Sequence, residues 1–186
     1  MKVVRPGFDW RGQAKRLCRE YPRRAHLPLA VVDPATQQLC VVSGRRLRAC
    51  YPVSTSRYGL GGDEGSWRTP TGAHYVFRKI GDGEPLFSRF VARRPVGEIA
   101  EPDAPGGDDA ICSRILQLAG LEPRVNRGGA RDSLRRCIYI HGTVDEKHIG
   151  SPASVGCVRM KNDDIVALFG QLAPGSLVYI LDGAPK

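Results

Sequence analysis

The segment from residue 139 to residue 160 reads YIHGTVDEKHIGSPASVGCVRM. It opens with a short apolar run of the kind found in buried strands, and His141 leaves that run directly into Gly142. Sixteen residues after His141 comes Cys157, which follows a glycine and lies two residues before Arg159. A fold that contains this segment must bring its two ends together before this histidine and this cysteine can react with a substrate.

These residue types suit a cysteine nucleophile with a histidine base. Nucleophilic catalysis needs a thiolate, a base within hydrogen-bond reach and donors for the oxyanion. Gly156 would let a substrate backbone approach closely and would leave N–H groups for a developing negative charge. Arg159 could hold a substrate carboxylate with its planar fork, and its positive charge would favour the thiolate of Cys157.

Two other interpretations of the same residues stay open at this point. A single cysteine in an apolar context is commonly a small core residue, so Cys157 could be structural. A zinc site could also be built from His141, His148, Cys157 and Cys137. Their spacings match no common ligand pattern, and we therefore predict neither a metal nor another cofactor.

Most of the remaining chain has the pattern of short strands. Apolar runs between turn signals predict strands at residues 29–33, 38–42, 46–53, 73–80, 137–141 and 177–181. Helical spacing predicts helices at 9–21, at 108–120 with Asp108 or Asp109 as the cap and Gly120 at the end, and from Asn162 or Asp163 to Leu172. Because strands dominate and no βαβ alternation occurs, we predict a mainly β, predominantly antiparallel fold with inserted helices.

Composition narrows the class of partner and the compartment. The chain has 186 residues and a formal charge of +9, but its paired arginines are not interleaved with aromatic residues, so nucleic-acid binding is not expected. No apolar stretch is long enough to span a bilayer. The first ten residues lack an apolar h-region, and the six cysteines form no CxxC pair. We therefore expect a cytoplasmic protein, or a periplasmic one if a leader precedes Met1. Nothing in the sequence indicates an oligomeric state.

The segment resembles the active-site motif of the L,D-transpeptidase catalytic domain family (YkuD-like). That motif is a His-Gly followed by Ser/Thr-x-Gly-Cys-x-Arg. Here the motif reads His141-Gly142-Thr143 and then Ser154-Val155-Gly156-Cys157-Val158-Arg159. Upstream blocks agree in order, namely Val32-Asp33, Gln38-Leu39, residues 51–55, Gly65-Ser66 and residues 69–72. The resemblance runs from about residue 29 to residue 181.

The resemblance implies a β-sandwich-like catalytic fold at residues 29–182, with residues 1–28 as an N-terminal helical extension. It implies Cys157 as nucleophile and His141 as base, facing each other in a cleft, with backbone N–H groups of Gly156 and Cys157 at the oxyanion. Arg159, Ser154 and Gly142 would bind or orient the substrate. The partner would be a peptidoglycan stem peptide or muropeptide, and a carbapenem would acylate the thiol.

The resemblance also implies cleavage of the bond between the third residue, a diamino acid, and D-Ala, through a thioester. Water as acceptor makes the enzyme an L,D-carboxypeptidase of peptidoglycan recycling, which the expected cytoplasmic location favours. An amine acceptor makes it an L,D-transpeptidase of cell-wall biogenesis, and a non-catalytic peptidoglycan-binding module is a further alternative. Val155 departs from the family, in which many members have histidine, so part of the usual hydrogen bonding is absent.

Overall fold

The computed structural model describes residues 7–103 and 110–183. The strands in these ranges are β1 Leu29–Asp33, β2 Gln38–Ser43, β3 Arg46–Pro52, β4 Gly72–Ile80, β5 Ser88–Val91, β6 Arg94–Ile99, β7 Ile111–Gly120, β8 Tyr139–Thr143, β9 Val158–Met160 and β10 Leu177–Ile180. The α-helices are α1 Trp10–Glu20 and α2 Asn162–Gln171, and short 3-10 turns lie at Pro22–Arg24, Gly129–Arg131 and Glu146–His148. The prediction of a mainly β fold with inserted helices is confirmed.

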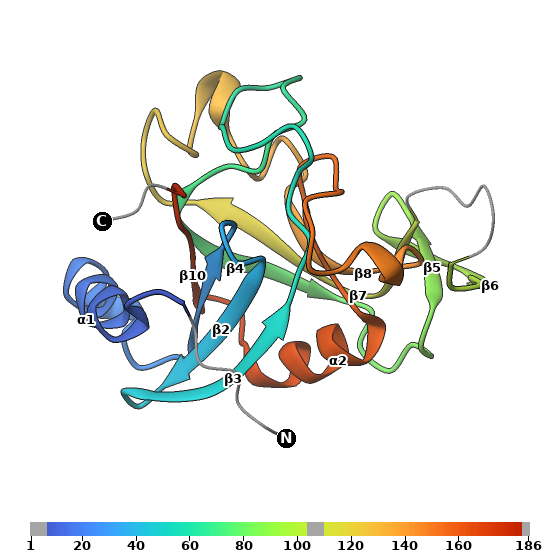
Figure 1. Cartoon of the computed structure of the whole chain (residues 1–186), viewed down its shortest axis with the longest axis horizontal. Coiled ribbons are helices and arrows are strands. Elements are labelled where there is room, and N and C mark those ends of the chain that lie inside the picture. The colour runs from blue at the N-terminus through green and yellow to red at the C-terminus, as the bar shows by residue number, and fades with distance from the viewer. Residues whose placement is uncertain (1–6, 104–109, 184–186) are drawn as a thin grey trace.

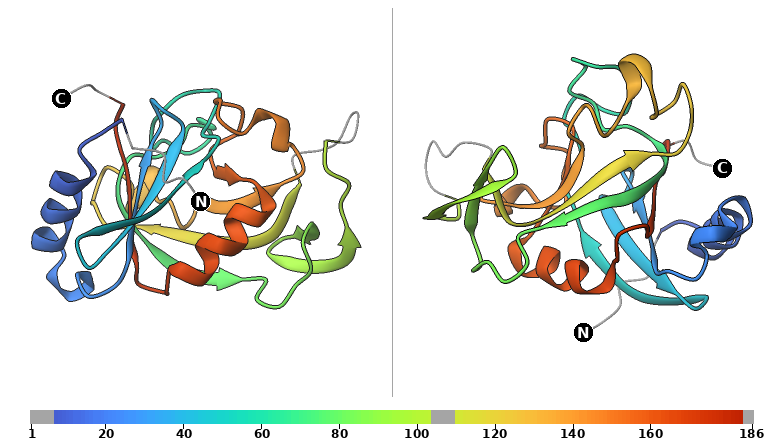
Figure 2. Two further views of the ribbon diagram at one scale, coloured as in Figure 1. Left: turned by 60° about the horizontal axis from the view of Figure 1, so that its bottom comes forward. Right: turned by 180° about the vertical axis from the view of Figure 1, so that it is seen from behind.

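The strands join into one twisted sheet. Its order is β3-β2-β1-β10-β4-β7-β5-β6, and β8 pairs with both β7 and β9. Most neighbours are antiparallel, but β1 pairs with β10 and β8 pairs with β9 in parallel. The α1 helix and the β5–β6 hairpin lie at opposite ends of the long axis of the molecule (Figure 1). Figure 2 shows the same separation in two further views.

The two halves of the sheet enclose one apolar core, which gives the fold its sandwich-like character. Buried side chains from β1–β3 meet side chains from β7–β9 and from α2, including Leu39, Val41, Leu118, Ile140, Val158, Ile165 and Leu168. On α2 the core residues recur at the helical spacing predicted from the sequence. Each fully buried Leu or Ile side chain contributes about 1.5–3 kcal/mol of hydrophobic free energy, so this core holds β8 and β9 rigidly in place.

The predicted first helix is confirmed and packs outside the sheet. Asp9 caps α1 by accepting a hydrogen bond from the backbone N–H of Gly12 at 2.9 Å. The apolar face of α1, with Ala14 and Leu17, contacts Val31 of β1 and Leu177 of β10. The helix therefore covers β1 and β10 at the end of the molecule away from the β5–β6 hairpin.

The predicted helix at 108–120 is wrong. Residues 111–120 form β7, which pairs with β4, β5 and β8 in the middle of the sheet. A strand buried on both faces shows no alternation of apolar and polar residues, so Ile111, Ile115 and Leu118 matched helical spacing by coincidence. The proposed caps Asp108 and Asp109 lie outside the described residues.

The six cysteines have no regular spacing in the sequence, which favours free thiols, and this expectation is wrong for one pair. Cys40 and Cys50 form a disulfide between β2 and β3, where they are direct cross-strand partners. Their spacing has no meaning until the register of the hairpin is known, because the pairing depends on the tight turn at Gly44-Arg45 and on a bulge between Val41 and Val42. Cys18, Cys112, Cys137 and Cys157 remain thiols.

In the described ranges, every helix is too short or too polar to cross a membrane.

Candidate active site

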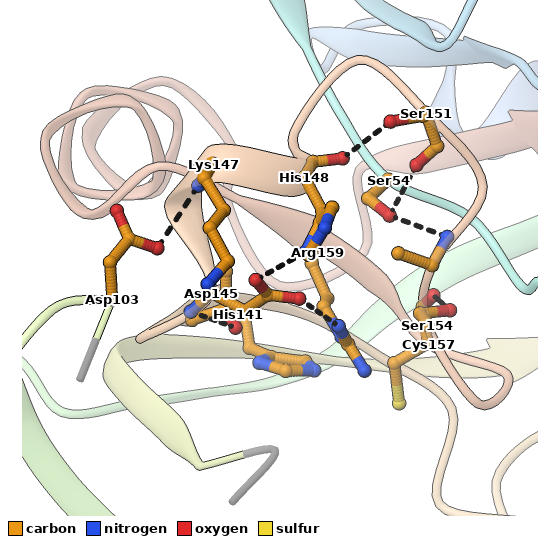
Figure 3. Close-up of polar contacts among 12 residues, drawn as sticks. Ser54, Asp103, His141, Asp145, Lys147, His148, Ser151, Ser154, Cys157 and Arg159 are labelled. Carbon is orange, nitrogen blue, oxygen red and sulfur yellow. Dashed lines mark hydrogen bonds and ion pairs between the residues drawn. The ribbon is translucent and has the colours of Figure 1, made fainter. Parts of the chain in front are cut away.

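The two predicted catalytic side chains lie on neighbouring parallel strands. His141 is on β8, is only 3% exposed, and pairs in register with Arg159 on β9. Cys157 directly precedes β9 and is half-buried. In the view of Figure 3, the guanidinium of Arg159 is drawn between the imidazole of His141 and the thiol of Cys157. The parallel pairing therefore brings together residues that the sequence separates by sixteen positions.

The thiol of Cys157 is held against the start of β8. The backbone N–H of Tyr139 points to Sγ at 3.4 Å, and Sγ donates to the carbonyl oxygen of Cys137 at 3.5 Å. Tyr139 also packs against Cys157 in a small apolar cluster with Phe90 and Ile115. The N–H of Tyr139 would stabilise a thiolate, whereas the carbonyl of Cys137 accepts from the S–H form, so the backbone at the start of β8 positions the sulfur in either protonation state.

The tautomer of His141 follows from its backbone partner. Its Nδ1 lies 2.8 Å from the carbonyl oxygen of Gly142. Because a carbonyl oxygen can only accept, Nδ1 carries the proton and Nε2 carries the lone pair that a general base needs. The geometry thus assigns the orientation of the His141 ring to the carbonyl of Gly142.

Ser154 shapes the turn that precedes the nucleophile. Its buried Oγ donates to the carbonyl oxygen of Cys157 at 2.6 Å and accepts from the backbone N–H of Gly156 at 3.3 Å. Gly156 has φ of +127°, which favours glycine. A Cβ at Gly156 would lie 3.6 Å from the carbonyl oxygens of Trp67 and Arg68. Ser154 and Gly156 thus fix the backbone that presents the thiol.

Gly142 is needed for close packing. A Cβ at this position would lie 2.4 Å from the side-chain oxygen of Asn162 and 2.7 Å from the carbonyl oxygen of Cys112. Asn162, the first residue of α2, donates to the carbonyl of Thr143 at 2.8 Å. The close approach of α2 therefore fixes the end of β8 that carries His141.

Arg159 lies inside the protein beside His141. Its side chain is 3% exposed, and its Nη1 pairs with Asp145 at 3.3 Å. The other oxygen of Asp145 pairs with Nδ1 of His148, whose side chain is at the surface. Asp145 was not predicted as a site residue, because a carboxylate in an irregular segment has no sequence signal. This geometry suits a role for Arg159 in orienting the site.

Arg136 is a second site residue that the sequence did not identify. Its guanidinium donates to the carbonyl oxygens of Gly61, Gly62 and Arg68 at 3.3, 3.0 and 2.8 Å, and so ties the glycine-rich loop at residues 58–68 to the segment just before β8. Burial lowers the pKa of Arg136, and the negative charge of Cys157 acts in the opposite direction. The same attraction favours the thiolate of Cys157.

His74 and His148 each have a hydrogen-bond partner within the protein. His74 on β4 is fully buried between the carbonyl of Gly72 and the hydroxyl of Ser133, and burial lowers its pKa to about 4. Among the described residues, no group of three or more His, Cys, Asp or Glu side chains is arranged to hold a metal ion. His148 instead pairs with Asp145.

The chain is similar in sequence to known proteins. The chain matches the family model of the L,D-transpeptidase catalytic domain (YkuD) over residues 28–180. It is 28% identical over 155 residues to YqjB of Bacillus subtilis (strain 168), whose name assigns it to the L,D-transpeptidases. That match covers 83% of this chain and 72% of YqjB.

Solved structures share the fold. L,D-transpeptidase 3 from Mycobacterium tuberculosis, in complex with a faropenem-derived adduct, has a TM-score of 0.53 at 15% identity and covers 82% of this chain. The L,D-transpeptidase from Xylanimonas cellulosilytica has a TM-score of 0.52 at 17% identity and covers 91% of this chain. The match spans 59% of the first of these chains and 69% of the second.

Proposed function

The chain belongs to the L,D-transpeptidase catalytic domain family, and from this premise we propose that it cleaves peptidoglycan stem tetrapeptides through a thioester on Cys157. The observation that carries the proposal is the pairing of β8 with β9. It places the thiol against the start of β8 and His141 further along the same strand, with the Nδ1 proton of His141 directed at a backbone carbonyl. That arrangement supplies a nucleophile and a base in the correct tautomer.

Acylation would proceed in two steps. Nε2 of His141 takes the thiol proton while Sγ attacks the carbonyl carbon between the third residue and D-Ala. The carbonyl oxygen becomes an oxyanion, for which the backbone N–H of Cys157 is the donor we propose. The C–N bond then breaks, and the imidazolium returns its proton to the amine of the leaving D-Ala. Free D-Ala and a thioester are the products.

The acceptor in the deacylation step determines which reaction the enzyme catalyses. The acceptor, water or an amine, gives a proton to Nε2 of His141 as it attacks the thioester carbonyl, and the C–S bond breaks to restore the thiolate. Water yields a tripeptide, and an amine of a second stem yields a cross-link. Val155, exposed one residue before Gly156, offers an incoming amine no side-chain hydrogen bond, which supports water as the acceptor.

The disulfide is the observation that favours the second candidate, transpeptidation. Structural disulfides persist in oxidising compartments, where cross-linked cell wall is built, and are rare in a reducing cytoplasm. The Cys40–Cys50 bond therefore supports an extracytoplasmic location and an amine acceptor. A cytoplasmic carboxypeptidase and an extracytoplasmic transpeptidase would share the acyl-enzyme and differ in the acceptor. One experiment that varies the acceptor therefore separates them.

The experiment incubates the protein with disaccharide tetrapeptide, with and without a D-amino acid or a second stem as acceptor. Tripeptide as the main product identifies a carboxypeptidase, whereas dimers or exchanged tetrapeptide identify a transpeptidase. Cys157→Ala should abolish both, and Cys18→Ala, on α1, should retain activity. Covalent labelling of Cys157 by a carbapenem tests the acyl-enzyme independently. Failure to label Cys157 and to release D-Ala would favour a non-catalytic binding module.

A further inference from the structure

The tip of the β5–β6 hairpin has an unusual backbone for its sequence. Ala92 and Arg93 link Val91 to Arg94, which are cross-strand partners, and their φ values are +48° and +68°. A two-residue turn with both φ values positive normally carries Asn-Gly or Asp-Gly, because a Cβ disfavours this conformation. A strained position that keeps a long charged side chain is a reason to look for a function of that side chain.

The side chain of Arg93 reaches across to β8. Its Nη1 donates to the hydroxyl of Tyr139 at 3.0 Å and to Sγ of Cys137 at 3.5 Å. Side chains alternate along a strand, so Tyr139 and His141 lie on one face of β8, and Cys137 lies in the turn just before the strand. The guanidinium therefore occupies the face that carries the base His141, and Tyr139 is roughly 7 Å from His141 along the strand.

The same two residues, Cys137 just before β8 and Tyr139 at its start, also hold the nucleophile. Cys137 and Tyr139 contact Arg93 through their side chains and Cys157 through their backbone. Both contacts of Arg93 use one nitrogen of a guanidinium that has five N–H donors. Arg93 itself is exposed, so an anion from solution can reach it.

Two other arginines near the thiol are engaged by partners within the protein. Arg159 is buried and paired with Asp145, and Arg136 donates to three backbone carbonyls of the glycine-rich loop. A stem tetrapeptide carries a carboxylate on its second residue and at its D-Ala terminus, and a further one when its third residue is a dicarboxylic diamino acid, all within a few bonds of the scissile carbonyl. An exposed planar fork beside the nucleophile matches a carboxylate by bidentate hydrogen bonding.

We propose that Arg93 forms a carboxylate-binding subsite for the donor stem peptide. This inference rests on the function proposed above, and it adds that the enzyme distinguishes a free carboxylate from its amide at one position of the donor. The test uses the free tetrapeptide and three singly amidated forms, modified at the second residue, at the side chain of the third residue or at the D-Ala terminus. The rate of release of D-Ala, or of D-alaninamide from the form amidated at the D-Ala terminus, gives kcat and KM for each substrate.

For the wild-type protein, one amidated substrate should lose roughly tenfold to a hundredfold in kcat/KM, mainly through KM. Arg93→Gln should lower kcat/KM for the free substrate by the same factor. It should not lower kcat/KM for that amidated substrate any further, because the substitution and the amidation remove the same interaction. Arg93→Gly should behave like Arg93→Gln although glycine relieves the turn, which separates loss of the guanidinium from loss of the hairpin. Ala92→Gly, which relieves the turn and keeps the guanidinium, should match the wild type.

If Arg93→Gln lowered kcat/KM by the same factor on all four substrates, or did not lower it at all, the subsite would be refuted. Binding of the four peptides to Cys157→Ala and to Cys157→Ala/Arg93→Gln, measured by calorimetry, tests the subsite without turnover. Wild-type protein that releases no D-Ala but discriminates the peptides in binding would refute the proposed reaction and keep the subsite. Equal binding of all four peptides to both variants would refute the subsite whatever the activity.

Discussion

Nδ1 of His141 donates its proton to the carbonyl oxygen of Gly142, the next residue in the chain, at 2.8 Å. Many catalytic histidines are oriented by a carboxylate that also stabilises the imidazolium. Here the contact is to a neutral backbone dipole on the same strand, so the orientation of the ring depends on the conformation of β8. The integrity of the strand, and of the Asn162 packing that fixes its end, is therefore part of the catalytic arrangement.

His141→Asn should separate the orientation of the side chain from its basicity. The amide nitrogen of asparagine can still donate to the carbonyl of Gly142, but asparagine cannot accept the proton of the thiol. We expect kcat to fall by about 10²- to 10⁴-fold, with little change in the melting temperature. His26→Asn, at an exposed position near α1, is the matched control and should keep wild-type kinetics. A variant at position 141 with unchanged kcat would require a different base.

Arg159→Lys should impair the enzyme although it conserves the charge. Lysine lacks the planar fork, and at this buried position it cannot reproduce the geometry of the pair with Asp145. We expect kcat/KM to fall about tenfold or more, and the effect of Asp145→Asn to be less than additive with it. Arg48→Lys on β3 serves as an exposed control. Wild-type kinetics for Arg159→Lys would contradict an orienting role.

Arg136→Gln should lower the reactivity of the nucleophile. The guanidinium interacts electrostatically with Cys157, and its removal makes the thiolate less favourable. We expect alkylation of Cys157 by iodoacetamide at pH 7, followed by peptide mass spectrometry, to slow by roughly three- to tenfold. Arg135→Gln, which removes only an exposed pair with Glu64, should leave this rate unchanged. Equal rates in both variants would show that Arg136 acts only through the glycine-rich loop.

His74 should make the folded protein sensitive to mild acid. Burial holds its pKa at about 4, below the ordinary value of 6.5. Between these values the unfolded chain binds a proton that the folded protein excludes, so the free energy of unfolding decreases as pH falls from 6.5 to 4. The loss at pH 4 amounts to about 3 kcal/mol. His74→Gln should flatten this part of the stability curve, measured by urea unfolding at several pH values, whereas His26→Gln should not.

Local patterns predicted short apolar runs bounded by turns and helices with one apolar face. Residues 29–33 and 38–42 are such runs, separated by a turn at Asp33-Pro34, and α1 and α2 each have one apolar face, so these elements were predicted correctly. The β7 strand has no polar face and was predicted as a helix. The β6 strand is exposed along its whole length and carries no apolar pattern, so the hairpin that presents Arg93 was not predicted.

The motif identified the residues at the ends of the catalytic segment but not the residues that support them. Cys157 and His141 could be named because their types and order suit one chemistry. Asp145, Arg136 and Arg93 reach the site only through the pairing of strands and the packing of loops, and in the sequence they are ordinary surface charges. The Cys40–Cys50 bond is of the same kind, since it depends on a register that no local pattern encodes.

The parallel pairing of β8 with β9 limits the insertions and deletions that the segment between these two strands can accept. Two adjacent parallel strands need a crossover of about a dozen residues or more, because a hairpin would reverse the second strand. Residues 144–157 form this crossover, and part of it, around residues 146–152, is exposed. Natural or engineered insertions there should be tolerated, and the distance between the two motif halves can grow. A deletion that leaves fewer than about ten residues would force an antiparallel return and separate the thiol from its base.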